Sequence, residues 1–232
     1  MFGVGPDRYG EGQRLESADV DVYLLDDGFQ HLQLARDVDI VLLDSTRPLC
    51  HESVLPAGRL REPSSAVNRA TAVVFTRTGS TFTKIAIRGF PKFTAYSAST
   101  KLLGFRRHGG DDPPQSLRQS LSVSHFAFCG IGNPDAFFAD LHRWGVPLAG
   151  RRAFRDHHRY TQSDIAALER AAKSAGANAL VTTEKDAQNL EKSFPAKLPI
   201  EIAIVSIDIS DEAGFVRDLD SKLPPAVGAV RS

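Results

Sequence analysis

Short apolar runs separated by polar residues dominate the first third of the chain. Three of them, at 20–25, 39–44 and 71–76, are rich in valine, isoleucine and leucine and show no clean alternation of polar and apolar positions. Such runs are typical of strands covered on both faces, as in a parallel sheet. From Gly79 to about Arg107 the apolar residues are scattered among threonine, serine and lysine, a pattern that predicts an antiparallel ribbon or linker.

Strand-like and helix-like segments alternate in the second half of the chain. Asn133 and Pro134 are a good N-cap and first residue for a helix, and Gly176 is a good helix stop. Alternation of this kind predicts a second open α/β sheet. The expected strands are 125–129, 179–183 and 200–209, and the expected helices are 134–144, 161–175 and 211–223.

The polar segment Gly109–Pro114 divides these two patterns. It is rich in turn-forming residues and has no hydrophobic periodicity, so it is the best candidate for a domain boundary. The length of 232 residues is enough for one or two domains with a sizeable core. We therefore expect an α/β protein with two sheets.

Composition excludes several classes of function. The 28 basic residues balance 28 acidic ones, so no global basic surface for nucleic acid is present, although a local surface for anionic lipid is compatible with this balance. Cys50 and Cys129 are far apart and form no C-x-x-C motif, which predicts neither a zinc site nor a disulfide framework. No stretch approaches the ~18 apolar residues of a spanning helix. These features favour a soluble or peripheral protein in a reducing compartment.

Two adjacent carboxylates, Asp26 and Asp27, follow the first apolar run. The glycine turn after them brings Gln30 and His31 to the same rim. Carboxylates at the carboxyl end of such a strand hold Mg²⁺ in phosphoryl-transfer folds. The alternative is a strand that ends in a solvated Asp-Gly turn. No G-x-x-x-x-G-K-[ST] phosphate-binding loop occurs in the sequence.

The segment Leu55–Pro63 is expected to be an ordered loop, because it contains two prolines and a glycine. It carries Arg59, Arg61 and Glu62. The planar guanidinium of arginine suits phosphate recognition. Pairing between the arginines and Glu62 on an ordinary surface loop explains the same residues equally well.

Three further segments carry polar residues at expected strand ends. The turn Gly130–Asp135 lies where a dinucleotide fingerprint would lie, but Asp135 in place of the third glycine favours a plain strand-to-helix turn. The segment Phe154–Tyr160 holds His157 and His158, and adjacent side chains usually point apart, so we expect at most one functional imidazole. The third segment, 181–186, is either a ligand rim or a helix N-terminus.

Taken together, these motifs resemble the tetraacyldisaccharide 4'-kinase family of lipid A biosynthesis. The matching stretches occur in the family's order and extend over nearly the whole chain, which makes them more specific than any single motif. They are Gly5–Arg8, Asp26–His31, Leu55–Glu62, Gly130–Pro134, Phe154–His158 and Thr183–Asp186.

The resemblance implies a fold of two Rossmann-like α/β/α domains. Residues 1–78 would be the remainder of a P-loop kinase-like core, 79–114 a β-ribbon linker, and 115–232 a C-terminal α/β domain. It implies transfer of the γ-phosphate of ATP to the 4'-hydroxyl of a tetraacylated glucosamine disaccharide lipid, at the cytoplasmic face of the inner membrane.

The resemblance also implies roles for individual residues. Asp26 and Asp27 would hold Mg²⁺ and its waters, with Gln30 and His31 lining the same site. The loop residues Arg61 and Glu62 would reach the nucleotide or the metal. An imidazole from the second domain would act at the catalytic centre, with His157 placed ahead of His158.

The sequence departs from the family in its first third. The family's membrane-associating helix, glycine-rich phosphate loop and a further acidic motif are absent, so we expect an amino-terminally truncated kinase with negligible activity by itself. The alternative is a non-catalytic α/β module that binds a lipid or a partner. A metal-dependent hydrolase using Asp26, Asp27 and a histidine is a further alternative, which predicts tight binding of a transition metal.

Overall fold

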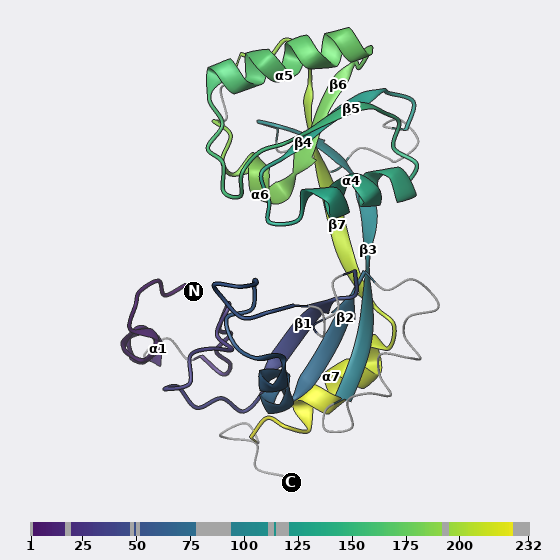
Figure 1. Cartoon of the computed structure of the whole chain (residues 1–232). Helices are drawn as coiled ribbons and strands as arrows, with labels where there is room; N and C mark the ends of the chain where they lie inside the picture. The colour runs from purple at the N-terminus through teal and green to yellow at the C-terminus, as the bar shows by residue number, and fades with distance from the viewer. Residues whose placement is uncertain are drawn as a thin grey trace. The chain divides into compact units, whose positions relative to one another are not determined.

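The computed structural model describes residues 2–16, 20–46, 49, 52–77, 94–110, 114, 121–191 and 195–224. Its strands form one seven-stranded sheet in the order β1-β2-β3-β7-β6-β4-β5 (Figure 1). The chain divides into two compact units, which we call unit 1 (residues 1–99 and 208–232) and unit 2 (residues 100–207). The long strands β3 (Thr94–Arg107) and β7 (Ile200–Ile209) each contribute to both units.

Unit 1 is built on parallel strands. β1 (Ile40–Asp44) pairs in register with β2 (Ala72–Thr76), and β2 pairs with the first residues of β3. The 3₁₀ helix η3 (Ser64–Arg69) contributes Val67 to the core on one side of β2. Helix α7 (Glu212–Asp220) packs Phe215 against Tyr96, with ring centroids 5.0 Å apart. The predictions of strands at 39–44 and 71–76 are therefore confirmed.

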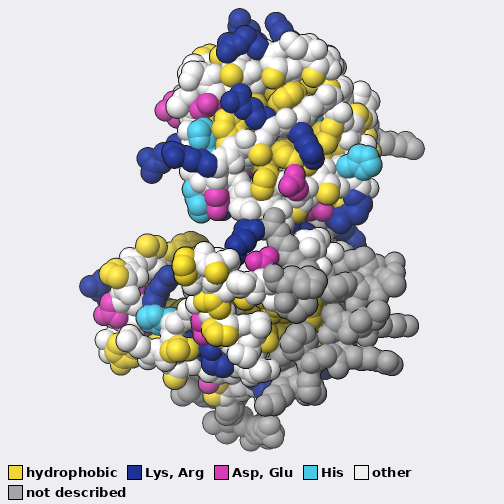
Figure 2. Space-filling view, viewed as in Figure 1, with side chains coloured by type: hydrophobic (Ala, Val, Ile, Leu, Met, Phe, Trp, Pro, Cys, Tyr) yellow, Lys and Arg dark blue, Asp and Glu magenta, His cyan; other side chains and the backbone are white. Residues whose placement is uncertain are grey.

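The prediction of a buried strand at 20–25 is wrong. These residues are irregular, and Val22, Tyr23 and Leu24 are all exposed, Leu24 to 93%. A strand needs a neighbour to satisfy its backbone and cover its side chains, and no described strand pairs with this segment. Exposed hydrophobic side chains are visible on the surface of unit 1 in Figure 2.

Unit 2 contains a parallel α/β arrangement. β4 (His125–Cys129) lies between β5 (Leu148–Ala153) and β6 (Ala179–Thr183), and β6 pairs with β7. Helix α4 (Pro134–Arg143) packs with Ala127 and Cys129, whereas α5 (Gln162–Ala175) packs with Phe126 and Phe128. Successive residues of a strand face opposite sides of a sheet, so the two helices cover opposite faces of the sheet (Figure 1).

Helix ends in unit 2 follow the sequence signals. The Asn133 side chain accepts a hydrogen bond from the Ala136 amide at the start of α4. Thr161 and Asp164 form a reciprocal capping box at the start of α5, and Gly176 ends that helix in the left-handed conformation with φ of 78°. The predicted helices at 134–144, 161–175 and 211–223 and the strands at 125–129, 179–183 and 200–209 are thus confirmed, apart from small differences at their ends.

Two elements differ from expectation. β5 was not predicted, because its sequence LAGRRA has little β propensity and its exposed half carries two arginines. Gly150 fits there because a side chain at that position would overlap the Phe126 ring on β4. The described part of the expected antiparallel ribbon, residues 94–107, is the single strand β3, which pairs in parallel with β2. Residues 78–93 lie outside the described part of the chain.

The remaining helices are short. They are α1 (Arg8–Leu15) in unit 1 and α6 (Glu184–Ala187) in unit 2. None of the helices in the described ranges has the length and apolar character needed to cross a bilayer. The α/β class is confirmed. The described strands belong to one sheet, and a division into two Rossmann-like domains is not shown.

We predict that the capping box of α5 makes unit 2 sensitive to acid through Asp164. Burial raises the pKa of this carboxyl, but hydrogen bonds from Thr161 and His158 outweigh burial and lower it below 3.8. The stabilisation is therefore fully present above the unfolded-state pKa and is lost as pH falls through the folded-state value. Asp164→Asn should cost about 1 kcal/mol of unfolding free energy at neutral pH.

Urea denaturation across pH tests this expectation. The difference between the native chain and Asp164→Asn should stay constant above about pH 5 and shrink as the pH falls through the folded-state pKa of Asp164, below which both side chains are neutral. Asp135→Asn, which alters another acidic residue in the first turn of a helix, is the control. A difference that stays constant as the pH falls through this pKa would show that the Asp164 charge is not what stabilises the cap.

Candidate functional site

The direction in which successive strands are added to the sheet reverses between the neighbouring strands β4 and β6, so the carboxyl ends of the strands of unit 2 are the natural place for a ligand. The chain leaves β4 toward β5 on one side and returns to β6 on the other. In open parallel α/β sheets, ligands bind at such a switch point, just beyond the carboxyl ends of the strands. Three segments converge there: the turn 130–133 after β4, the loop 154–160 after β5, and residues 183–186 after β6.

A buried carboxylate joins these segments. Asp186 is 0% exposed, and its Oδ1 accepts hydrogen bonds from the Gly130 amide and the Tyr160 hydroxyl, both at 2.8 Å. Its Oδ2 accepts from the Thr183 hydroxyl at 2.7 Å. Burial, reinforced by Asp186, raises the pKa of Tyr160, so its hydroxyl stays protonated and available as a donor. Asp186 therefore connects the three segments from inside the unit and is not exposed to a ligand at the rim.

The two adjacent histidines have different surroundings. The His158 ring stacks on Phe154, with centroids 4.6 Å apart, and its Nε2 lies 3.1 Å from Asp164 Oδ2. Its side chain is only 20% exposed, whereas that of His157 is 73% exposed. His158 thus fastens the loop to the start of α5, and His157 presents its imidazole to solvent.

The rim beside His157 carries both signs of charge. Asp156 lies 3.8 Å from the His157 Nε2 and accepts a hydrogen bond from the Lys185 ammonium at 3.3 Å. Nearby Cys129 does not contribute a nucleophile, because burial and the Asp186 charge raise the pKa of its thiol to about 12. The exposed groups are therefore an imidazole, a carboxylate and an ammonium.

Unit 1 brings together several of the residues singled out in the sequence. The Arg61 guanidinium donates to Asp27 Oδ2 at 2.7 Å and to Gln30 Oε1 at 3.5 Å. Asp27 has a φ of 50° in the turn that follows Asp26. Both partners of the Arg61–Asp27 pair are more than half exposed, so solvent screens it and the pair is easily exchanged for another ligand.

The second charged residue of the 55–63 loop is held differently. Glu62 pairs with Arg69 at 2.9 Å, and the Arg69 guanidinium lies over the Phe29 ring, 4.6 Å from its centroid. The hydrogen bond from Arg69 lowers the pKa of Glu62, with burial opposing and Gln30 assisting. The loop itself requires Gly58, where a side chain would overlap the Ser53 backbone. The 55–63 loop and the 27–30 turn are thus connected at two points.

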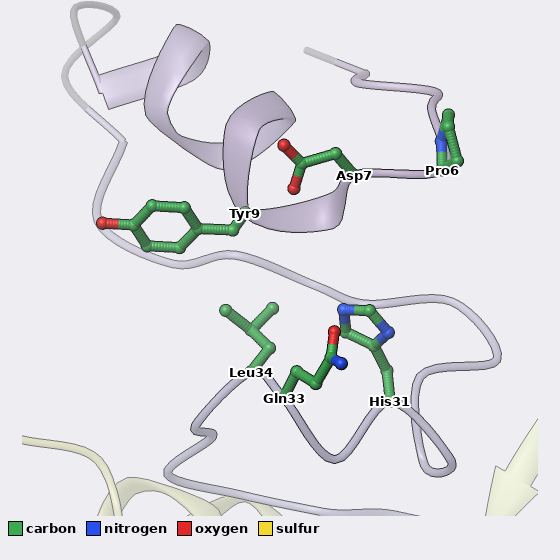
Figure 3. Close-up of a pocket in the computed structure, with 6 residues that line it drawn as sticks. All are labelled: Pro6, Asp7, Tyr9, His31, Gln33 and Leu34. Carbon is green, nitrogen blue, oxygen red and sulfur yellow. The ribbon is translucent and has the colours of Figure 1, made fainter.

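His31 lines a cavity of about 430 Å³ within unit 1 (Figure 3). Its ring, together with Gln33 and Leu34, faces Asp7 and Tyr9 from the α1 segment. The sequence reasoning placed His31 at the rim with Asp26 and Asp27 and did not identify Tyr9 or Gln33. The Gly5–Arg8 motif contains Asp7 and was the available signal.

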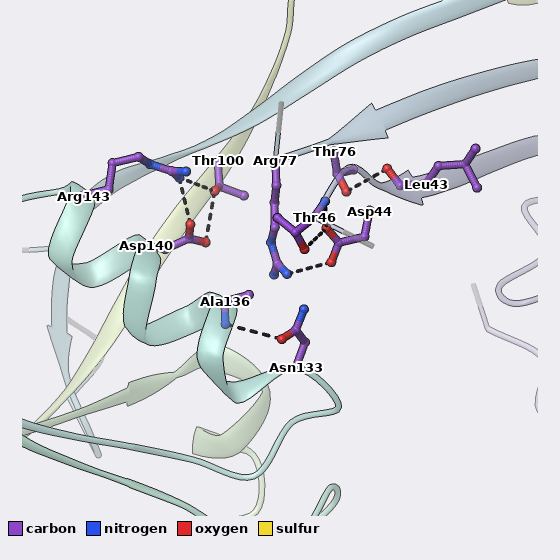
Figure 4. A network of polar contacts seen from close by, with 10 residues as sticks. All are labelled: Leu43, Asp44, Thr46, Thr76, Arg77, Thr100, Asn133, Ala136, Asp140 and Arg143. Carbon is purple, nitrogen blue, oxygen red and sulfur yellow. Dashed lines mark hydrogen bonds and ion pairs between the residues drawn. The ribbon is translucent and has the colours of Figure 1, made fainter. Parts of the chain in front are cut away.

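Further polar contacts lie at the end of β1 in unit 1 and on helix α4 in unit 2 (Figure 4). In unit 1, Asp44 at the end of β1 accepts from Thr46 and pairs with Arg77 at 3.0 Å. In unit 2, Asp140 on α4 pairs with Arg143 at 2.9 Å. These contacts are sufficient to explain their residues as structural.

The described residues offer adjacent carboxylates in unit 1 but no compact set of metal ligands. No group of three or more histidine, cysteine, aspartate or glutamate side chains that could hold a metal occurs in the described part of the chain. Mg²⁺ is commonly held by one or two carboxylates together with substrate phosphates. Asp26 and Asp27 fit that requirement, whereas the sites that tightly bind a transition metal require more protein ligands.

These features define an α/β protein of the class that gathers charged side chains at the carboxyl ends of parallel strands. The family model for tetraacyldisaccharide-1-P 4'-kinase matches residues 1–224. The chain belongs to this family.

Relatives and a solved structure agree with this assignment. The tetraacyldisaccharide 4'-kinases of Geobacter metallireducens and Geobacter sulfurreducens are 38% and 39% identical to the chain, each over 96% of it. The chain spans 65% and 62% of these relatives. The fold is similar to that of the apo form of LpxK from Aquifex aeolicus in complex with ATP, with a TM-score of 0.66, 23% identity and coverage of 93% of this chain and 62% of that one.

We predict that Arg36 positions the His31 cavity. Its guanidinium donates to the carbonyls of His31 and Leu34 at 2.6 and 2.8 Å and pairs with Asp39 at 2.7 Å, with 15% of the side chain exposed. Arg36→Met leaves these acceptors without their donor at a cost of about 2 kcal/mol. Amide hydrogen exchange in peptides covering residues 31–44 should accelerate at least about tenfold.

Arg14→Met is the matched control, because Arg14 is 76% exposed in its pair with Glu11. Exposed pairs of this kind contribute little, so exchange at residues 31–44 should remain at the native rate. Equal protection in Arg36→Met and Arg14→Met would contradict the positioning role of Arg36.

Proposed function

We propose that this chain carries part of the catalytic machinery of a tetraacyldisaccharide 4'-kinase. The reaction is transfer of the γ-phosphate of ATP to the 4'-hydroxyl of a tetraacylated glucosamine disaccharide lipid. The observation that supports it most is the clustering of Asp27, Gln30 and Arg61 in a chain whose first 224 residues match the kinase family. The lipid substrate implies work at a membrane surface, the cytoplasmic face of the inner membrane.

In this proposal the unit 1 cluster serves the nucleotide. Asp26 and Asp27 hold Mg²⁺, which when bound neutralises charge on the phosphates. Arg61 leaves its exposed pair with Asp27 and binds phosphate oxygens, for which the guanidinium geometry is suited. Gln30, His31 and Glu62 orient ligands around this centre.

The exposed imidazole of His157 serves the acceptor. An exposed imidazole can take the proton of an attacking hydroxyl or orient that hydroxyl. Asp156 Oδ2 lies 3.8 Å from the His157 Nε2, close enough to orient the imidazole. His158 is assigned to packing, because Phe154 and Asp164 already engage it.

The proposal includes an incomplete phosphate site in this chain. The 232 residues contain no glycine-rich phosphate-binding loop, whose backbone amides and lysine position the γ-phosphate in P-loop enzymes. We expect negligible kinase activity for the chain by itself. We also assign residues 1–78 to the nucleotide-binding core, 79–114 to a linker and 115–232 to the second of two Rossmann-like domains, although residues 208–232 belong to unit 1.

ATP titration by calorimetry in the presence of Mg²⁺ tests the proposal. We compare this chain with a chimaera in which it follows the part of the Geobacter metallireducens kinase that precedes the matched region. The chimaera should bind ATP and the chain by itself should not, because only the chimaera has a complete phosphate cradle. In the chimaera, Asp27→Asn should weaken binding at least about tenfold, the effect of losing a charge-assisted contact.

Asp37→Asn, an exposed carboxylate outside the cluster, is the matched control and should bind ATP as tightly as the parent chimaera. If Asp27→Asn and Asp37→Asn weakened ATP binding equally, the proposed metal-binding role of Asp27 would be contradicted. Saturable binding of ATP by the chain alone would favour a module that binds ligands by another route.

A further inference from the structure

We propose that Asp186 is a positioning residue that fixes the backbone of His157 through Gly130. The geometry of this relay stands by itself, and its catalytic meaning rests on the proposed role of His157. Asp186 is fully buried and touches neither the rim nor the imidazole of His157, so its effect is transmitted by hydrogen bonds.

Gly130 is the middle of the relay. Its amide donates to Asp186 Oδ1 at 2.8 Å, and its carbonyl accepts from the His157 amide at 3.0 Å. Gly130 makes both bonds. The Asp186 carboxylate therefore holds the residue whose carbonyl accepts from His157, and it restricts the position of that carbonyl. The His157 amide is thereby held two hydrogen bonds away from a buried charge.

His157 adopts a backbone conformation that requires such support. Its φ is 57°, in the left-handed region that residues with a Cβ seldom occupy. A non-glycine residue stays there only where its surroundings determine the conformation. The described contacts of its amide are the Gly130 carbonyl and the Asp156 carboxylate, the latter also at 3.0 Å.

The same loop is fastened to Asp186 a second time. Tyr160 donates its hydroxyl to Asp186 Oδ1 at 2.8 Å, three residues after His157. A side chain at Gly130 would come within 2.9 Å of the Arg155 carbonyl and 3.1 Å of the His158 Cβ, so the loop packs directly on this glycine. Asp186 therefore restrains the loop at two places, at the His157 amide through Gly130 and directly at Tyr160. The exposed imidazole of His157 extends from this restrained backbone.

Nuclear magnetic resonance of the 232-residue chain tests the relay without an activity assay. The ¹³Cα and ¹³Cβ shifts of His157 report its left-handed backbone, and the exchange rate of its amide reports the bond to Gly130. In Asp186→Ala the shifts should move toward ordinary values, and the amide should exchange at least about fivefold faster, as expected for one lost hydrogen bond. Asp186→Asn keeps an acceptor oxygen and should restore both.

Two further variants separate positioning from general destabilisation. Leu168→Ala opens the core of unit 2 beneath α5 and lowers stability without removing a hydrogen bond of the relay, so the His157 shifts should stay native. Tyr160→Phe removes only the second fastening and should produce a smaller change than Asp186→Ala. Native His157 shifts in Asp186→Ala, or shifts displaced equally in Leu168→Ala, would overturn the proposal.

A measurement on the native chain covers the case in which Asp186→Ala does not fold. Scalar coupling across the hydrogen bond should connect the Gly130 amide nitrogen to the Asp186 carboxylate carbon, and the His157 amide nitrogen to the Gly130 carbonyl carbon. Absence of either coupling would overturn the relay. Failure of the kinase assay would leave these couplings unaffected, so the two proposals fail separately.

Discussion

A single buried carboxylate, that of Asp186, joins the three segments that follow β4, β5 and β6 in the second unit. Asp186 accepts hydrogen bonds from the Gly130 amide and from the hydroxyls of Tyr160 and Thr183, one in each of these segments. A fully buried charge is tolerated only when it is well satisfied, and here each bond also locates a loop. In our proposal the hydrogen bonds that Asp186 accepts therefore set the shape of the rim that presents His157, although Asp186 itself is fully buried.

The first unit has the opposite character. Its candidate residues meet through exposed, screened contacts such as Arg61 with Asp27, which are weak and exchangeable. The proposed site for a metal ion and phosphates requires this property, because a ligand can then replace an existing pair at little cost. The exposed segment 20–25 and the uncovered outer residues of β1, such as Leu42, show that this unit buries its apolar residues less completely.

Local signals in the sequence predicted much of the fold and part of the site. Caps such as Asn133 and Thr161 were readable because capping depends on neighbouring residues. The segment 20–25 was misjudged because burial depends on a neighbouring strand that no local pattern contains. The sequence placed His157 ahead of His158 without a physical reason, and the packing of His158 on Phe154 and its contact with Asp164 now distinguish the two. The role of Asp186 was not readable, since its partners lie 26 and 56 residues away.

The most direct test of the kinase account is phosphate transfer from ATP to the disaccharide lipid under single-turnover conditions. The protein is the chimaera described above, with His157→Ala and His158→Phe compared in parallel. The account predicts that His157→Ala slows transfer by about 10²- to 10⁴-fold with unchanged ATP affinity, whereas His158→Phe lowers stability and leaves transfer nearly intact. Transfer at the parent rate in His157→Ala would contradict it.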